Sequence, residues 1–264
     1  MTTTKGKMRS EIDGAVGVMI FDNPARHNAV SLGMWEAVPA ILDGFAADDA
    51  IRVVVVRGAG GKAFVSGADI SEFESARSGA AAQAHYERTS AAAMEAFARL
   101  RKPLVASIDG YCIGGGLAVA LACDLRIASA SSRFGIPAAR LGLGYGFAGV
   151  KKLVDTVGPA YAREILFTAR HYDADAAWRM GLVNQVVPAA EFEATIAGLV
   201  GAMAQNAPLT IQAAKEAVDQ ALRPESERDL GHVQALVERC FASEDYTEGR
   251  TAFMQKRRPL FRGR

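Results

Sequence analysis

The sequence of 264 residues predicts an α/β fold, because short apolar runs of strand length alternate with segments of helical character. The clearest runs are "AVGVMIFD" (15–22), "IRVVVVRG" (51–58) and "PLVASIDG" (103–110). The second is apolar without alternation, as expected of a strand that is buried on both faces of a parallel sheet. Parallel strands are joined by right-handed crossovers, so we expect a largely parallel sheet.

Helices fill the gaps between these strands. Ser31 is placed to cap a helix over 32–48, although a proline interrupts that segment. The alanine-rich segment from about 78 to 100 predicts a long helix, since alanine has the highest helix propensity. A shorter helix through "LAVALAC" (117–123) leads into another strand, "DLRIAS" (124–129).

Beyond residue 149 the chain becomes mostly helical. Glycines and turn residues end several short helical segments, and one short apolar run predicts a last strand. The expected helices are 149–158, 159–169 and 173–181, then the strand 183–187, then helices at roughly 190–206, 208–222, 225–243 and 246–256.

These patterns divide the chain into a core over 1–200 and a helical C-terminal region over 201–264. No linker rich in proline, serine or glycine separates the two, so we expect the C-terminal region to pack as an extension of the core. Its amphipathic helices and basic end, "KRRPLFRGR", form a surface suited to oligomerisation.

The overall composition excludes several classes of function. The formal net charge of +1 provides no general attraction to nucleic acid or anionic membranes. No apolar stretch approaches the roughly 18 residues of a membrane span, and the N-terminus lacks the apolar run of a secretory signal. The three cysteines, Cys112, Cys123 and Cys240, are too scattered for a disulfide framework or a zinc site. We therefore expect a cytoplasmic protein without a membrane, nucleic-acid or metal partner.

Two strand-like runs break at glycine and lead toward helix: "FVSGADI" (64–70) and "GYCIGGGLAVALACDLRIA" (110–128). A helix N-terminus carries unpaired N–H donors, and glycine lets the backbone approach a ligand closely. Two such donors that converge on one point form an oxyanion hole for a carbonyl that gains negative charge. Glycine-rich turns before helices also serve packing alone, and both interpretations remain open from these residues.

The two glycine breaks closely resemble, in order and spacing, the two signature segments of the crotonase, or enoyl-CoA hydratase/isomerase, superfamily. The resemblance covers nearly the whole chain, including "NPARHNAV" (23–30), "FTARHYDADAAWRMGLVNQVVP" (167–188) and "DYTEGRTAFMQKRRPLF" (245–261). It implies a crotonase-like spiral of ββα units with a helical C-terminal region, assembled as a homotrimer or a dimer of trimers. It also implies a lyase or isomerase that acts on acyl-CoA thioesters.

The same resemblance assigns the residues around the thioester. The backbone N–H groups of Ala68 and Gly115 are implied to hold the thioester oxygen as an enolate forms. The neighbouring substrate contacts implied by these motifs are Ser66, Gly67, Asp69, Ile70 and Gly114. From the residues alone, Asp69 is also suited to capping a following helix.

Two side chains expected of a hydratase are missing. Similar hydratases carry glutamates at the positions occupied here by Ala118 and Ala138. Each acid or base typically contributes about 10²- to 10⁴-fold in rate, so ordinary hydration is not expected. Tyr145 is the best remaining side chain, because some similar decarboxylases carry a tyrosine in that loop, although they also differ from this chain at Ala68 and Ala118. The alternatives are an acyl-CoA decarboxylase and a catalytically lapsed homologue that binds acyl-CoA or scaffolds an oligomer.

The remaining assignments concern coenzyme A. Arg26 and His27 lie in a loop whose basic residue often meets the nucleotide in similar proteins, and Phe253 and Lys256 match positions that reach a neighbouring subunit's coenzyme. No separate cofactor is expected, since acyl-CoA is the substrate. "GYGFAG" (144–149) has the spacing G-x-G-x-x-G, but no convincing strand precedes it, so it does not predict a dinucleotide site.

Overall fold

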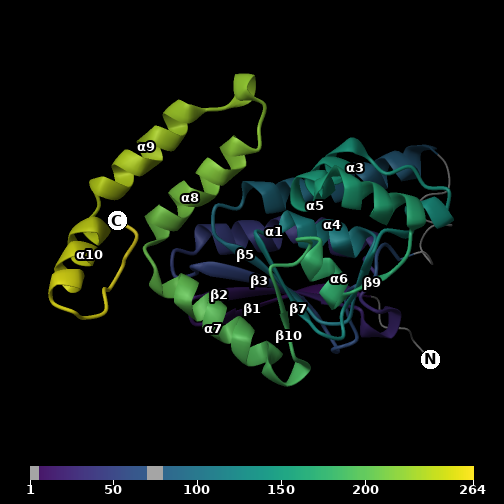
Figure 1. The fold of residues 1–264 in the computed structure, drawn as a ribbon, viewed down its shortest axis with the longest axis horizontal. Coiled ribbons are helices and arrows are strands. Elements are labelled where there is room, and N and C mark those ends of the chain that lie inside the picture. Colours follow the sequence, from purple (N-terminus) through teal and green to yellow (C-terminus); the bar gives the residue numbers. More distant parts are fainter. Residues whose placement is uncertain (1–5, 70–79) are drawn as a thin grey trace.

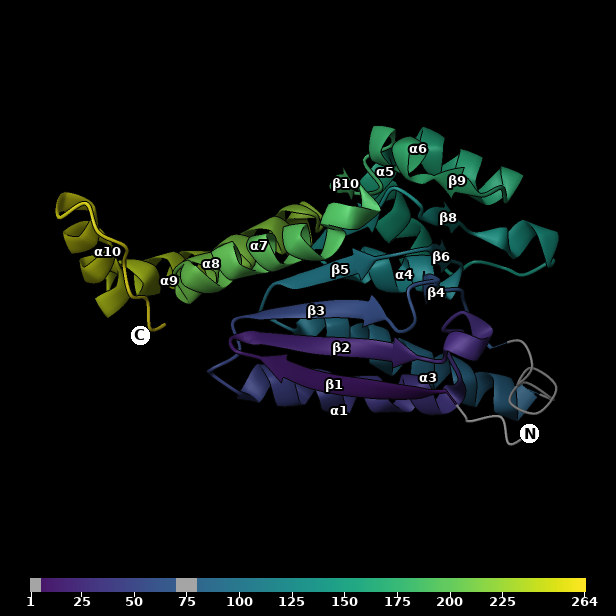
Figure 2. The ribbon, with the colours of Figure 1, turned by 90° about the horizontal axis from the view of Figure 1, so that it is seen from below.

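A computed structural model of the protein describes residues 6–69 and 80–264. Six strands form its larger sheet, in the order β1-β2-β3-β5-β7-β10. All neighbours in this sheet are parallel except β1 and β2, which form an antiparallel hairpin. Figure 2 shows the stacked strands β1, β2, β3 and β5. Their bounds are β1 Lys7–Asp13, β2 Val16–Asp22, β3 Val53–Gly58, β5 Leu104–Ile108, β7 Leu125–Ser129 and β10 Gln185–Val187.

The predicted parallel α/β arrangement is therefore confirmed, and the sequence interpretation missed β1. That strand is mostly exposed and lacks the apolar run that marks its neighbours. A two-residue turn joins it to β2, with Gly14 at φ 56°, the sign required at the first position of a type II′ turn. Cross-strand pairing, rather than its own apolar residues, fixes β1 in place.

A smaller sheet contains the order β4-β6-β8-β9. Its first three strands are parallel and only three residues long, too short to show a period in the sequence. Because parallel strands point the same way, the segments that follow these three strands emerge at one edge of the small sheet. The strand bounds are β4 Ala63–Val65, β6 Tyr111–Ile113, β8 Arg133–Gly135 and β9 Tyr172–Asp173.

Helices cover both faces of the larger sheet. Alternate residues of β3 point to opposite sides: Val54 and Val56 join a core with α1, α3, α4 and α5, whereas Val53 and Val55 pack against α7. The hydroxyl of Ser31 accepts a hydrogen bond from Met34 N at the start of α1, as predicted. These helices are α1 Leu32–Ala47, α3 Ala80–Arg99, α4 Gly115–Ala122, α5 Phe147–Thr168 and α7 Phe192–Gln205.

Two helix boundaries follow from local backbone chemistry. Within α5 the backbone leaves helical geometry at Gly158 (φ 74°, ψ 166°), just before Pro159, which matches the two helices expected there. The helix expected from residue 225 instead begins later, because the carboxylate of Asp229 accepts a hydrogen bond from His232 N and caps it there. The remaining helices are α6 Ala174–Arg179, α8 Pro208–Ala221, α9 Leu230–Phe241 and α10 Glu244–Met254.

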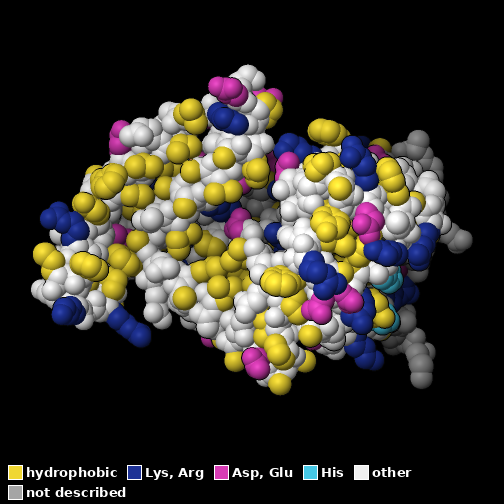
Figure 3. Space-filling model, in the orientation of Figure 1, with side chains coloured by type: hydrophobic (Ala, Val, Ile, Leu, Met, Phe, Trp, Pro, Cys, Tyr) yellow, Lys and Arg dark blue, Asp and Glu magenta, His cyan; other side chains and the backbone are white. Residues whose placement is uncertain are grey.

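Helices α8, α9 and α10 form an extension that runs away from the body, with α10 at its far end (Figures 1 and 2). Figure 3 shows hydrophobic side chains spread over this extension. The most exposed of them are Val218, Leu230, Phe241, Phe253, Met254 and Leu260. Among the described helices, none is both long and apolar enough to cross a membrane.

Candidate active site

The segments that follow β4, β6 and β8 meet at the edge of the small sheet. The first contains Gly67 and Ala68, and the second contains Gly114 and Gly115. A Cβ built on Gly115 would lie 3.8 Å from Ala68 N and 3.8 Å from Gly67 Cα. Gly114 N donates a 2.8 Å hydrogen bond to the carbonyl of Gly135, which holds the third segment beside the second. The two glycine breaks predicted from the sequence are therefore in direct contact.

The loop that precedes α1 orients the first break. Val30 N donates to Gly67 O (2.8 Å), and Asp69 N donates to Val30 O (3.0 Å). These two bonds form a parallel bridge between Val30 and Ala68. In such a bridge the N–H of the central residue points away from its partner, so the Ala68 N–H faces away from Val30.

The second break starts α4. Gly114 has φ 56° and ψ −117°, a conformation that glycine adopts without strain. The N–H of Gly115, in the first turn, has no partner within its own helix. Helix α4 approaches β4 so closely that a Cβ on Gly116 would lie 1.9 Å from Val65 O. Of the residues that the structure describes, none accepts a hydrogen bond from the N–H of Ala68 or Gly115.

Two alanines border this edge. Ala118 lies one helical turn after Gly115 and is half-buried, whereas its neighbours Leu117 and Val119 are fully buried. Ala138 is also half-buried, in the short 3₁₀ segment Pro137–Arg140 that follows β8. Neither methyl group can donate or accept a proton.

Tyr145 lies in the loop between this 3₁₀ segment and α5. Its ring packs over Gly149, where an added Cβ would lie 2.7 Å from the tyrosine Cε1. Burial raises the pKa of Tyr145 to about 12, with a smaller contribution from Cys112. No hydrogen bond joins its hydroxyl to another described residue. The phenol is therefore neutral at physiological pH and is able to donate a hydrogen bond.

Cys112 lies two residues before Gly114, in β6, and is fully buried. Burial raises the pKa of the Cys112 thiol well above its ordinary value, and Cys123 adds to the effect. A thiolate, rather than a thiol, is the nucleophile in cysteine chemistry, so Cys112 is a packed apolar residue here.

Arg26 and His27 lie at the rim of the first break. The guanidinium of Arg26 forms an ion pair with Asp69, with Nη1 at 2.8 Å and 3.0 Å from the two carboxylate oxygens. The ring of His27 packs edge-on against Tyr111, with 5.9 Å between centroids. Ser66 donates from its backbone to His27 O (3.1 Å) and from its hydroxyl to Arg26 O (3.3 Å). The loop and the first break are thus a single hydrogen-bonded unit.

One residue that positions this unit was missed in the sequence. Asn28 is fully buried in the left-handed conformation (φ 56°), and its amide donates to the carbonyls of Ala59 and Ala63. Its carbonyl oxygen accepts a hydrogen bond from Asn23 N. Asparagine tolerates this backbone conformation better than most residues. The residue type at position 28 was therefore the signal in the sequence that could have pointed to this role.

The other predicted residues lie apart from this edge. Phe253 is 86% exposed near the end of α10, and Lys256 follows that helix, at the far end of the extension from the body that contains α4 (Figure 1). Their contact with a neighbouring subunit's coenzyme stays a prediction. Ile70 lies outside the described residues, as does any helix that Asp69 would cap. Within the described ranges, no group of three His, Cys, Asp or Glu side chains is placed to hold a metal ion.

Comparison with known proteins identifies the family of this chain. Residues 11–264 match the family model described as enoyl-CoA hydratase/isomerase. The short-chain-enoyl-CoA hydratase of Clostridium acetobutylicum is 32% identical over 251 residues, covering 94% of each chain. The crotonyl-CoA hydratase of Syntrophomonas wolfei is 32% identical over 261 residues, covering 95% of this chain and 96% of its own.

A solved structure gives the same result for the fold. The crystal structure of an enoyl-CoA hydratase/carnithine racemase from Magnetospirillum magneticum superposes with a TM-score of 0.91 at 32% identity, covering 99% of this chain and 97% of the other. The match includes the helical extension as well as the two sheets. Because the family model, the curated relatives and the solved structure all match over nearly its full length, this chain belongs to the enoyl-CoA hydratase/isomerase family.

Proposed function

We propose that this chain processes acyl-CoA by stabilising the enolate of the thioester between the N–H groups of Ala68 and Gly115. The observation that carries the proposal is the contact between the two breaks, in which Ala68 N lies 3.8 Å from the Cβ position of Gly115. Two preorganised N–H donors stabilise an oxyanion strongly where water is excluded. Family membership supports an acyl-CoA thioester as the source of that oxygen.

The residues at two positions of the chain argue against ordinary hydration. Adding water across a double bond needs a base that activates the water and an acid that protonates carbon. Ala118 and Ala138 occupy the places where similar hydratases carry those groups, and an alanine supplies neither. Chemistry that depends on the oxyanion hole and not on a carboxylate base fits these residues better.

Decarboxylation is the reaction that best meets this condition. In a malonyl-type thioester, the bond between the α-carbon and the carboxylate breaks, and its electron pair moves into the enolate as CO₂ leaves. The α-carbon then takes a proton, which the Tyr145 hydroxyl donates before water reprotonates the phenolate. The neutral state of Tyr145, with its pKa of about 12, supports the role of donor over that of base.

The rest of the proposal concerns the coenzyme and the assembly. Arg26 and His27 lie at the rim of the hole, where they meet the nucleotide of coenzyme A, and no further cofactor takes part. Phe253 and Lys256 contact the coenzyme of a neighbouring subunit in a trimer or a dimer of trimers. The exposed apolar side chains on the extension support such an assembly. The three unpaired cysteines are consistent with a cytoplasmic enzyme.

A second candidate is a homologue that binds acyl-CoA without converting it. The two alanines favour this alternative, because they remove acid–base groups while leaving the backbone hole intact. Affinity does not separate the two functions, since both predict saturable binding. Turnover does.

The test is mass spectrometry of acyl-CoA thioesters incubated with the enzyme in deuterated water. The mixture holds crotonyl-, longer enoyl-, aryl-, methylmalonyl- and ethylmalonyl-CoA, with Tyr145→Phe measured in parallel. Loss of CO₂ with gain of deuterium, impaired in Tyr145→Phe, is the expected result. Gain of water well above the blank would show that hydration proceeds without the glutamates, and the argument from the alanines would be wrong. Saturable binding with no conversion would favour the binder.

A further inference from the structure

A concave site lies between the body and the helical extension. It is a cavity of about 520 Å³, within the size range of small-molecule sites. One wall comes from the residues before β3 and β5, and the other from α8, α9 and the chain end. Its basic lining residues are Arg52, Arg101, Lys102, Arg239, Arg262 and Arg264, against a single acidic one, Asp49.

This excess of positive charge is local, because the whole chain has a formal net charge of only +1. Two of the six cations have partners: Lys102 Nζ donates to the carbonyls of Phe45 and Asp48 (2.6 Å each), and Arg264 pairs with Glu244 (3.2 Å). The other four guanidinium groups form no ion pair with any residue that the structure describes. They belong to Arg52, Arg101, Arg239 and Arg262.

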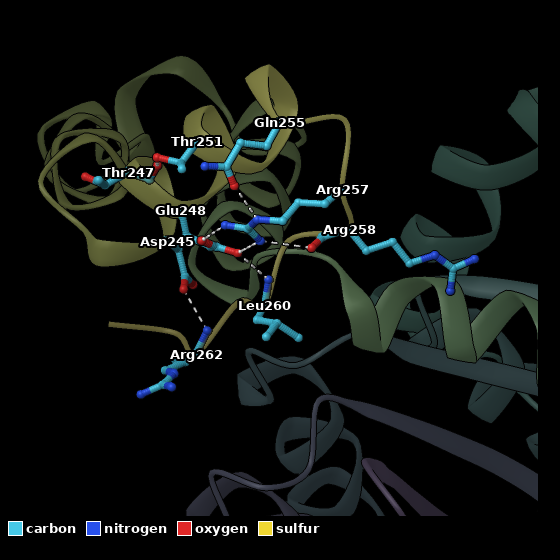
Figure 4. Close-up of polar contacts among 9 residues, drawn as sticks. All are labelled: Asp245, Thr247, Glu248, Thr251, Gln255, Arg257, Arg258, Leu260 and Arg262. Atoms are coloured by element: carbon cyan, nitrogen blue, oxygen red, sulfur yellow. Dashed lines mark hydrogen bonds and ion pairs between the residues drawn. The ribbon is translucent and has the colours of Figure 1, made fainter.

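The wall formed by the chain end is held in place. The carboxylate of Asp245, which is 4% exposed, accepts hydrogen bonds from Arg262 N (2.6 Å) and Gly263 N (2.8 Å). Figure 4 shows that the guanidinium of Arg262 points away from this carboxylate, so Asp245 fixes the backbone and forms no ion pair with the side chain. The cavity therefore has a rigid basic wall on this side.

The two walls approach each other at Gly263. A Cβ built there would lie 3.0 Å from Pro208 Cγ and 3.3 Å from Arg52 Nη1. The guanidinium of Arg52 thus lies against the chain end that carries Arg262. Like charges gathered in a concave site focus a positive potential, which favours an anion of matching size.

The guanidinium group suits phosphate in particular. Its planar fork donates two parallel hydrogen bonds to a phosphate group and stays charged at every physiological pH. One phosphate carries at most about two negative charges near neutral pH, fewer than the four unpaired arginines. A ligand with at least two phosphates matches this charge better.

We propose that this cavity binds a compact ligand with two or more phosphate groups, such as a nucleotide or inorganic pyrophosphate. The site is distinct from the thioester edge, by which we mean the edge of the small sheet where the two glycine breaks meet. Arg52 and Lys102 lie just before the starts of β3 and β5, whereas the glycine breaks follow the ends of β4 and β6. The bound ligand bridges the body and the extension, and so fixes the orientation of the extension.

The experiment is isothermal titration calorimetry on the full chain at constant salt, with pyrophosphate, tripolyphosphate, ADP, ATP and coenzyme A as separate probes. The double variant Arg52→Gln/Arg239→Gln removes one cation from each wall. Arg179→Gln, an exposed arginine at the end of α6, is the matched control. Circular dichroism shows whether each variant folds, and the single variant Arg101→Gln provides an independent test.

We expect saturable binding of at least one phosphate probe, weakened tenfold or more by the double variant and unchanged by Arg179→Gln. Tighter binding of a nucleotide than of pyrophosphate identifies the nucleotide as the ligand, and equal binding identifies the phosphates as the recognised group. Absence of saturable binding by every probe would overturn the proposal. The proposal would also be overturned if every probe that binds the parent chain binds the folded double variant equally well, because the probes then bind elsewhere, as coenzyme A would at the glycine breaks. Equal weakening by Arg179→Gln would overturn it too.

Discussion

Ala68 and Gly115 are 47 positions apart in the sequence, yet the Ala68 nitrogen lies 3.8 Å from where a Gly115 side chain would begin. The contact arises because two three-residue parallel strands, β4 and β6, end side by side. The groups that this contact brings together are backbone N–H groups rather than side chains. Its function is therefore best tested by removing one N–H without removing a side chain.

Gly115→Pro removes that N–H. Proline is tolerated at the first position of a helix, where the lost hydrogen has no helical partner. Gly115→Ala is the matched control, because it adds a Cβ in ordinary contact with Ala68 N while it keeps the N–H. We expect the proline variant to turn over about 10²- to 10³-fold more slowly than the alanine variant. Equal rates in two folded variants would show that the Gly115 N–H does not stabilise the transition state.

Ala118→Glu and Ala138→Glu test why hydration is not expected. Both alanines are half-buried beside the glycine breaks, so each glutamate would start from the edge where the thioester is proposed to lie. If missing carboxylates limit hydration, the double variant should hydrate crotonyl-CoA at least about 10²-fold faster than the parent chain. Ala118→Gln/Ala138→Gln keeps the size and lacks the ionisable group. A parent chain that already hydrates as fast as the glutamate variant would contradict the argument.

Tyr145 gives a prediction for high pH. Its pKa is raised from 10 to about 12, so the fold holds the phenol proton more tightly than the unfolded chain does. Stability is therefore fully present below about pH 10 and falls as the pH rises from there toward 12. Ultraviolet titration of tyrosinate, as a difference between the parent and Tyr145→Phe, should show one group that ionises near pH 12. A difference that titrates near pH 10 would place this phenol in water.

The sequence predicted the parts of this molecule that local residues specify. The four consecutive valines of β3, the Ser31 cap and the Gly158–Pro159 break all act within a few residues of their own position. Of the small sheet, the sequence showed only the strand-like runs that end at the two glycine breaks, because β8 and β9 are two or three residues long, and it missed β1 because that strand has few buried residues. At the candidate site the glycine breaks were visible as motifs. The ion pair of Arg26 with Asp69 and the buried amide of Asn28 were not, since both join segments at least 31 positions apart.

Glu248 gives the converse prediction at low pH. Its carboxylate accepts hydrogen bonds from Arg257 and from Leu260 N, which fold the chain end back onto α10 (Figure 4). The side-chain bond from Arg257, followed by the backbone bond from Leu260, lowers the pKa of Glu248 from 4.5 to about 2. A depressed pKa means that this stabilisation is fully present above pH 4.5 and is lost as the pH falls through 2.

Hydrogen exchange at the Leu260 amide measures this directly, as protection relative to the intrinsic rate at each pH. Protection should hold down to about pH 4.5 and decline toward pH 2 in the parent chain. Glu248→Gln should show lower protection at neutral pH and little change on acidification, because its amide binds Arg257 without charge. Glu227→Gln, in the 3₁₀ turn before α9, should behave like the parent. If the Leu260 amide of the parent exchanges freely at neutral pH, Glu248 does not anchor the chain end, and the basic wall formed by Arg262 depends on Asp245 alone.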